Sequence, residues 1–155
     1  MSTYKATIQW SRDRDQTFTD NRYSRGHDWL FDGGLKIPAS ASPNVVPLPL
    51  SIEENIDPEE AFVASLSSCH MLFFLSIAAK RGWVVDHYID QAVGEMGKGE
   101  GGTLFMQRVI LRPEISFSGS NQPSKKEISE IHHESHTQCF IANSVKTEVV
   151  IQKPN

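Results

Sequence analysis

Polar and apolar residues alternate near the start of the chain, and this alternation predicts two short strands. In residues 3–10 the apolar side chains occupy the even positions and share one face, as in a half-buried strand. Residues 22–31 are predicted to be the returning strand, which ends at an Asp-Gly-Gly turn signal at residues 32–34. Residues 38–49 then contain four prolines. Because proline fixes φ and lacks an N–H, we expect an extended loop there and neither a helix nor a central strand.

The longest apolar stretch of the chain predicts a central helix over residues 57–82. Asp57 is suited to the N-cap, Pro58 to the first helical position, and Glu60 completes a capping box. Gly82 is a natural stop signal. At ~1.5 Å per residue the helix is on the order of 35 Å long. It is apolar nearly all round, and a chain of 155 residues has little else to cover it. The pattern therefore indicates a dimer.

Residues 61–79 are also the candidate membrane span of this sequence. Four serines and His70 interrupt them, and strand-like segments follow. A helix that is apolar all round is buried either in a core or in a membrane. We prefer the buried core helix and expect no membrane partner.

The last third of the chain is predicted to form a hairpin, a helix and a strand over residues 83–155. The two arms of the hairpin are residues 83–96 and 103–117, joined by a Gly- and Lys-containing turn. A second helix begins at Pro123 and carries Ile131 on its inward face, and residues 145–152 close the chain as a strand.

Composition adds three expectations. A chain of 155 residues with 39% hydrophobic content predicts one domain over residues 1–155: the hairpin and proline-rich loop (1–56), the central helix (57–82) and the C-terminal part (83–155). A net charge of −4 without a basic cluster argues against a nucleic-acid partner. The first ten residues lack an apolar signal region, so two cysteines indicate a reducing cytoplasm in which a disulfide is transient and catalytic.

The two cysteines lie 70 positions apart in unlike surroundings. Cys69 lies deep in the apolar stretch, whereas Cys139 ends a polar, His-rich run. We expect one thiol in a dry core and the other near the surface, an arrangement that dithiol chemistry requires. Two idle cysteines would give the same pattern.

A reactive Cys69 needs a cation beside it. A thiol in the middle of a helix gains nothing from the helix dipole, and an apolar setting raises its pKa. Arginine suits this role because its forked donors can grip a thiolate and a carboxylate together. The candidates in the N-terminal hairpin are Arg12, Arg14, Arg22 and Arg25. Arg25 shares its predicted face with large rings and would point inward, and the alternative is a solvated strand arginine.

A carboxylate would hold such an arginine in place. Glu59 and Glu60 open the helix that carries Cys69, although acidic residues stabilise the first turn of any helix. Ten residues of helix put Glu59 about 15 Å from Cys69 along the axis. An arginine must therefore bridge them, or Glu59 must come from a second subunit.

The histidines offer two further interpretations. His70 faces about 100° away from Cys69 and is not expected to be its base. His132, His133, His136 and Cys139 could hold a metal ion, but a fourth suitably spaced ligand is missing, and a solvated helix face explains the histidines equally well. The sequence has no phosphate-binding loop, dinucleotide fingerprint or serine-hydrolase elbow, so we expect no cofactor and no metal.

The chain resembles the OsmC/Ohr family of osmotic-stress and organic-hydroperoxide proteins. The resemblance rests on Asp57-Pro-Glu-Glu-Ala-Phe-Val-Ala-Ser-Leu-Ser-Ser-Cys69, which is similar to the family's helix start, and on Cys139 followed by Asn143-Ser144-Val145 and a final strand. It implies an α+β fold: an OsmC-like intertwined homodimer with antiparallel sheets wrapped around long central helices and two active sites at the interface.

The resemblance also implies a thiol-dependent peroxidase for organic hydroperoxides. Cys69 would become a sulfenic acid, Cys139 would condense with it to a disulfide, and a dithiol such as a dihydrolipoyl protein would reduce that disulfide. Glu59 matches the family's glutamate. The family's arginine best matches Arg25, with Arg22 as the fallback.

The chain departs from the family pattern at Cys139, where Phe140 replaces the usual proline. A pocket bordered by Phe62, Phe73, Phe74 and Phe140 is expected to favour a bulky apolar hydroperoxide. The alternatives are a non-enzymatic OsmC-like stress or ligand-binding dimer with idle thiols, and a metal-binding protein that uses Cys139 and the nearby histidines.

Overall fold

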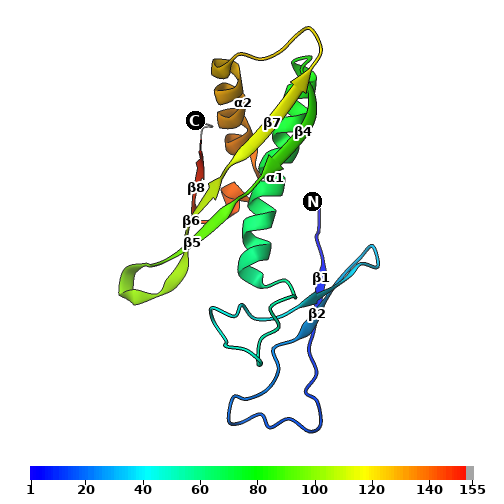
Figure 1. Cartoon of the computed structure of the whole chain (residues 1–155), viewed down its shortest axis with the longest axis vertical. Helices are drawn as coiled ribbons and strands as arrows, with labels where there is room; N and C mark the ends of the chain where they lie inside the picture. Colours follow the sequence, from blue (N-terminus) through cyan, green and yellow to red (C-terminus); the bar gives the residue numbers. More distant parts are fainter. Residues whose placement is uncertain (153–155) are drawn as a thin grey trace. The chain divides into compact units, whose positions relative to one another are not determined.

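The computed structural model describes residues 1–152, which fall into two compact units. The N-terminal unit is Met1–Ala61 and the C-terminal unit begins at Phe62. The elements are β1 (Ala6–Gln9), β2 (His27–Phe31), β3 (Lys36–Ala39), α1 (Pro58–Lys80), β4 (Val84–Asp90), β5 (Val93–Lys98), η1 (Glu100–Gly102), β6 (Leu104–Leu111), β7 (Pro113–Ser118), α2 (Lys125–Gln138), η2 (Ala142–Ser144) and β8 (Glu148–Ile151) (Figure 1).

The N-terminal unit contains an antiparallel sheet in the order β1-β2-β3. The predicted hairpin is confirmed, but its strands are shorter than expected. Strand β2 begins at His27, and the residues before it leave the sheet because the Arg25 N–H donates to the Leu50 carbonyl at 2.7 Å. Pro38 lies in β3, an edge strand, where its missing N–H breaks no ladder within the sheet.

Helix α1 has the start and stop that the sequence predicts. Glu60 N–H donates to Asp57 Oδ1 at 2.7 Å and Asp57 N–H donates to Glu60 Oε2 at 3.2 Å, which is a reciprocal capping box. Gly82 ends the helix with a positive φ of 76°, a conformation that glycine adopts without strain. Among residues 1–152, α1 is the one helix long and apolar enough to cross a membrane, a test that buried core helices also pass.

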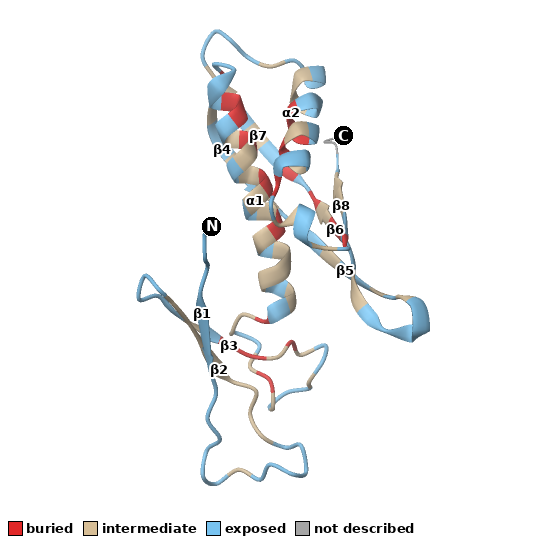
Figure 2. Ribbon diagram, turned by 180° about the vertical axis from the view of Figure 1, so that it is seen from behind, coloured by how far each residue is buried: buried red, intermediate tan, exposed pale blue. Residues whose placement is uncertain are grey.

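One stripe of α1 is buried in the C-terminal unit. Its members recur at helical spacing and are Leu66, His70, Phe74, Ile77 and Ala78. Leu66 packs with Val109 and Leu111 of β6, whereas Phe74 and Ile77 pack with Trp83 and with Ile131 of α2. Figure 2 shows these buried positions along α1 and α2. The two clusters fix the rotation of α1 about its axis, which determines where its polar side chains point.

The predicted long hairpin is present, but each arm is broken into two strands. Strand β4 pairs with β7, and β5 pairs with β6, both antiparallel. At the break, Asp90 accepts hydrogen bonds from the Arg112 N–H at 2.6 Å and from the Ser67 hydroxyl of α1. The closing strand β8 is shorter than predicted and pairs with β6 in parallel. The result is the expected mixture of two helices with largely antiparallel sheets.

Candidate thiol site

The structure brings together the two thiols that the sequence singles out. Cys69 lies in the middle of α1, and Cys139 is the C-cap residue of α2. Both are free thiols, and they lie close enough for Cys69 to raise the pKa of Cys139. Because both residues belong to the C-terminal unit, this juxtaposition is a property of one compact unit.

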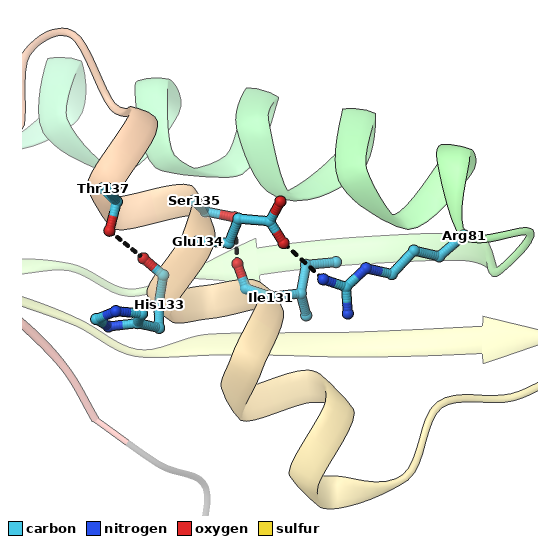
Figure 3. A network of polar contacts seen from close by, with 6 residues as sticks. All are labelled: Arg81, Ile131, His133, Glu134, Ser135 and Thr137. Atoms are coloured by element: carbon cyan, nitrogen blue, oxygen red, sulfur yellow. Dashed lines mark hydrogen bonds and ion pairs between the residues drawn. The ribbon is translucent and has the colours of Figure 1, made fainter.

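Helix α2 is fixed to α1, and this attachment positions Cys139. Ser124 and Glu127 form a capping box at the start of α2. Near the other end, Arg81 Nη2 binds Glu134 Oε2 at 2.6 Å, and the two side chains point toward each other across the helices (Figure 3). The Ser135 hydroxyl donates to the Ile131 carbonyl at 2.6 Å on the buried side of the same turns.

The chain turns sharply after α2, and the turn surrounds the Cys139 sulfur. The Cys139 N–H donates to the His136 carbonyl at 3.3 Å, and the Ala142 N–H donates to Cys139 Sγ at 3.4 Å. Ile141 and Ala142 pack against the core cluster of Leu66. The turn thus carries Cys139 into the interior beside α1.

The expected exposure of the two thiols is wrong. Cys69, predicted in a dry core, is partly exposed, whereas Cys139, predicted near the surface, is 1% exposed. The reason is the rotation of α1: the buried stripe passes through His70, and Cys69 lies about 100° round the helix from it. Cys139 follows a polar helix, but the turn after α2 places its side chain inside.

Burial and, as a smaller cause, the neighbouring Cys69 thiol together raise the pKa of Cys139 to about 11. The Ala142 N–H opposes this effect only in part. At neutral pH Cys139 is therefore a protonated thiol held against a more accessible one. Two neighbouring thiols can pass between the dithiol and the disulfide state.

Arg25 and Glu59 belong to the N-terminal unit. Arg25 precedes β2, and its guanidinium lies 3.7 Å from the centre of the Tyr23 ring and donates to Asn21 Oδ1 at 2.9 Å. Of the four candidate arginines it is the partly buried one; Arg22 is exposed. In the described part of the chain Arg25 and Glu59 form no ion pair with each other. Their roles beside Cys69 stay predictions.

A buried pair of histidines was not predicted from the sequence. His70 Nε2 and His132 Nδ1 lie 2.9 Å apart, and the His132 ring packs 4.6 Å from the Phe74 ring centre. Burial lowers the pKa of His70 to about 3 and that of His132 to about 4, so both imidazoles are neutral. The signal was available, because His70 lies midway between Leu66 and Phe74 at a spacing of four residues.

The candidate metal ligands His132, His133 and Cys139 face different surroundings in the structure. His132 turns toward His70, His133 is exposed, and Cys139 is buried near Cys69. Across residues 1–152, no three His, Cys, Asp or Glu side chains gather closely enough to hold a metal ion. The expected pocket border is also wrong in one member, because Phe74 is fully buried in the core.

Comparison with known proteins gives a family and a fold. The family model described as OsmC-like protein matches residues 53–153. An OsmC-like protein of unknown function from Vibrio cholerae O1 biovar eltor str. N16961 is 56% identical, with a TM-score of 0.96, over 98% of this chain and 99% of its own. No curated protein matches significantly.

Two organic hydroperoxide resistance proteins share the fold at low identity. The protein from Elizabethkingia anophelis is 16% identical with a TM-score of 0.70, over 97% of this chain and 93% of its own. OhrB of Bacillus subtilis is 15% identical with a TM-score of 0.66, over 97% of each chain. The fold is thus shared over nearly the whole length of the chain.

Proposed function

Because this chain belongs to the OsmC-like protein family, we propose that it is a thiol-dependent peroxidase that reduces organic hydroperoxides. The observation that carries the proposal is the proximity of the Cys69 and Cys139 thiols, which is close enough for Cys69 to raise the pKa of Cys139. Relatives of the same fold that are named for organic hydroperoxide resistance support the substrate class. We expect the reaction to run in a reducing cytoplasm without a bound cofactor.

The reaction proceeds in three steps. The Cys69 thiolate attacks one peroxide oxygen, the O–O bond breaks, and the leaving alkoxide takes up a proton to become an alcohol. Cys69 is then a sulfenic acid. The Cys139 sulfur attacks the Cys69 sulfur, water leaves, and a disulfide forms. An external dithiol, such as a dihydrolipoyl protein, reduces it through a mixed disulfide and returns both thiols.

The exposure of the two thiols and the pKa of Cys139 indicate which sulfur reacts first. Cys69 is partly exposed and can meet a hydroperoxide, whereas Cys139 is buried. The thiolate is the reactive form, and the raised pKa of Cys139 keeps it protonated at neutral pH. Cys139 therefore reacts second, after the sulfenic acid has formed beside it.

Arg25 and Glu59 complete the proposed site. An arginine guanidinium beside Cys69 would stabilise the thiolate form by its positive charge. Glu59, in the first turn of α1, would orient that guanidinium by a paired hydrogen bond. Arg25 is our choice from the family resemblance, and it is also the least exposed of the four candidates.

The proposed functional form is a homodimer. Helix α1 leaves apolar side chains uncovered in the single chain: Leu72 is 60% exposed, and Met71, Phe73 and Leu75 are only partly buried. A contiguous apolar face on a long central helix is suited to a second copy of the same chain.

Mass spectrometry of the reduced protein after one equivalent of cumene hydroperoxide tests the proposed function. We expect a loss of two hydrogens per chain and a peptide in which Cys69 is linked to Cys139. Hydrogen peroxide at the same concentration is the comparison, and we expect slower disulfide formation with it. A protein that keeps both thiols free after treatment would contradict the peroxidase and favour the ligand-binding alternative.

A further inference from the structure

Two phenylalanine rings meet beside the thiol pair. Phe73 lies one helical turn after Cys69 on α1, and Phe140 directly follows Cys139. Their ring centres are 5.1 Å apart at an interplanar angle of 88°, an edge-to-face arrangement. Such pairs contribute beyond the area that they bury.

The Phe140 ring is otherwise open to solvent. It is 70% exposed, although an apolar ring gains from burial. The polar contacts of its own turn are local: the Ser144 hydroxyl donates to the Phe140 carbonyl at 2.7 Å, and Asn143 Nδ2 donates to the Thr137 carbonyl at 3.0 Å. These bonds shape the turn but do not attach it to α1.

Two separate contacts attach the turn after α2, one on each side of Cys69. Ile141 and Ala142 attach the turn to the cluster around Leu66, which lies three residues before Cys69. The Phe73–Phe140 contact attaches it on the other side, four residues after Cys69. Cys69 therefore lies between two attachment points of the segment that carries Cys139.

We propose that Phe73 and Phe140 form an aromatic clamp that holds Cys139 against Cys69 and so favours disulfide formation between them. The two phenylalanines are positioning residues, because they act through the cysteine that each one neighbours. The catalytic consequence rests on the proposed peroxidase function; the effect on the thiol pair does not.

The clamp decides between two fates of oxidised Cys69. In the first, Cys139 attacks the sulfenic acid, and a disulfide and water form. In the second, a further hydroperoxide oxidises the sulfenic acid to a sulfinic acid and is itself reduced to the alcohol. The first is intramolecular, so its rate depends on how often the two sulfurs meet. A loosened turn gives the second reaction more time.

Equilibration with reduced and oxidised glutathione measures the effective concentration of the thiol pair, and so the effect of the clamp, without any peroxide. Oxidised glutathione takes two electrons from Cys69 and Cys139, which form a disulfide, and two reduced glutathiones are released. From the usual strength of an edge-to-face pair, we expect Phe140→Ala to lower the effective concentration of the thiol pair about 3- to 10-fold. Phe140→Tyr keeps the ring and should retain the wild-type value. Leu104→Ala removes a 62% exposed apolar side chain from β6 and is the matched control.

Double substitution tests whether the two rings act together. Phe73→Leu keeps an apolar side chain on α1 and removes the ring, so it also guards against a folding defect. If the rings form one clamp, the double variant Phe73→Leu, Phe140→Ala should lower the effective concentration of the thiol pair no more than the larger single change does. Strictly additive effects, or an unchanged effective concentration in Phe140→Ala, would overturn the clamp.

Excess cumene hydroperoxide then tests the consequence for catalysis. We expect Phe140→Ala to accumulate about 3- to 10-fold more Cys69 sulfinic acid per disulfide formed than the wild type does. An unchanged ratio overturns the clamp's catalytic role. If glutathione reveals the clamp but hydroperoxide leaves the wild-type thiols unoxidised, the peroxidase proposal fails and the clamp stands as a property of the thiol pair.

Discussion

Cys69→Ser is expected to reduce hydroperoxide consumption to the uncatalysed rate, the largest loss that any single substitution in this chain should cause. Serine has nearly the same shape but no sulfur to accept oxygen, and its hydroxyl is not deprotonated at neutral pH. The measurement is the loss of cumene hydroperoxide in the presence of a dihydrolipoyl reductant.

The matching substitution of the second thiol should behave differently. Cys139→Ser keeps the first oxidation but removes the partner for the disulfide, so we expect one equivalent of hydroperoxide to be consumed per chain before the protein stops. Ser68→Ala changes the exposed neighbour of Cys69 on the same helix and should leave turnover intact. Sustained turnover in Cys69→Ser would disprove the assignment of the attacking thiol.

Acid is expected to destabilise the protein through His70 and His132. Their pKa values in the folded chain are about 3 and about 4, below the ordinary value of 6.5. The cause is mainly burial, and for His132 the nearby Asp90 opposes it. The unfolded state therefore binds more protons than the folded state at acidic pH. The stabilisation is complete above about pH 6.5 and is lost as the pH falls toward 4.

The expected loss is large. Each pKa unit corresponds to about 1.4 kcal/mol. Lowering the pH from 6.5 to 4.5 should therefore reduce the free energy of unfolding by about 2–3 kcal/mol for each imidazole. Urea unfolding at several pH values measures this loss, with one fixed protein concentration because the stability of the proposed dimer would depend on concentration. His70→Gln should show a shallower decline with falling pH.

His133→Gln is the control for this titration, because His133 lies on the same helix as His132 but is exposed. Its stability should fall with pH as steeply as that of the wild type. An identical pH dependence in His70→Gln and the wild type would show that the buried pair does not titrate on unfolding.

Local signals in the sequence were sufficient for most of the secondary structure. The capping box of Asp57 and Glu60 and the stop at Gly82 fix α1 because they act within one turn of the chain. The strands were less well predicted. The break at Asp90 depends on a hydrogen bond with Arg112, 22 residues away, which leaves no local pattern.

The site was predicted in part. The apolar and polar surroundings of Cys69 and Cys139 singled out the two thiols, but exposure followed from the rotation of α1 and the turn after α2. The same rotation buried His70, whose spacing to Leu66 and Phe74 was readable in the sequence but was not used. Arg25 and Glu59 rest on the family resemblance.

What the sequence determined by itself is the set of elements, the family and the two sulfur atoms, because capping, periodicity and motifs are recorded in neighbouring residues. Only the tertiary structure decided that the two thiols are neighbours, which one is buried, and that two imidazoles and two phenyl rings pair nearby. These pairings join α1 to α2 and the turn that follows, and packing between distant segments selects them.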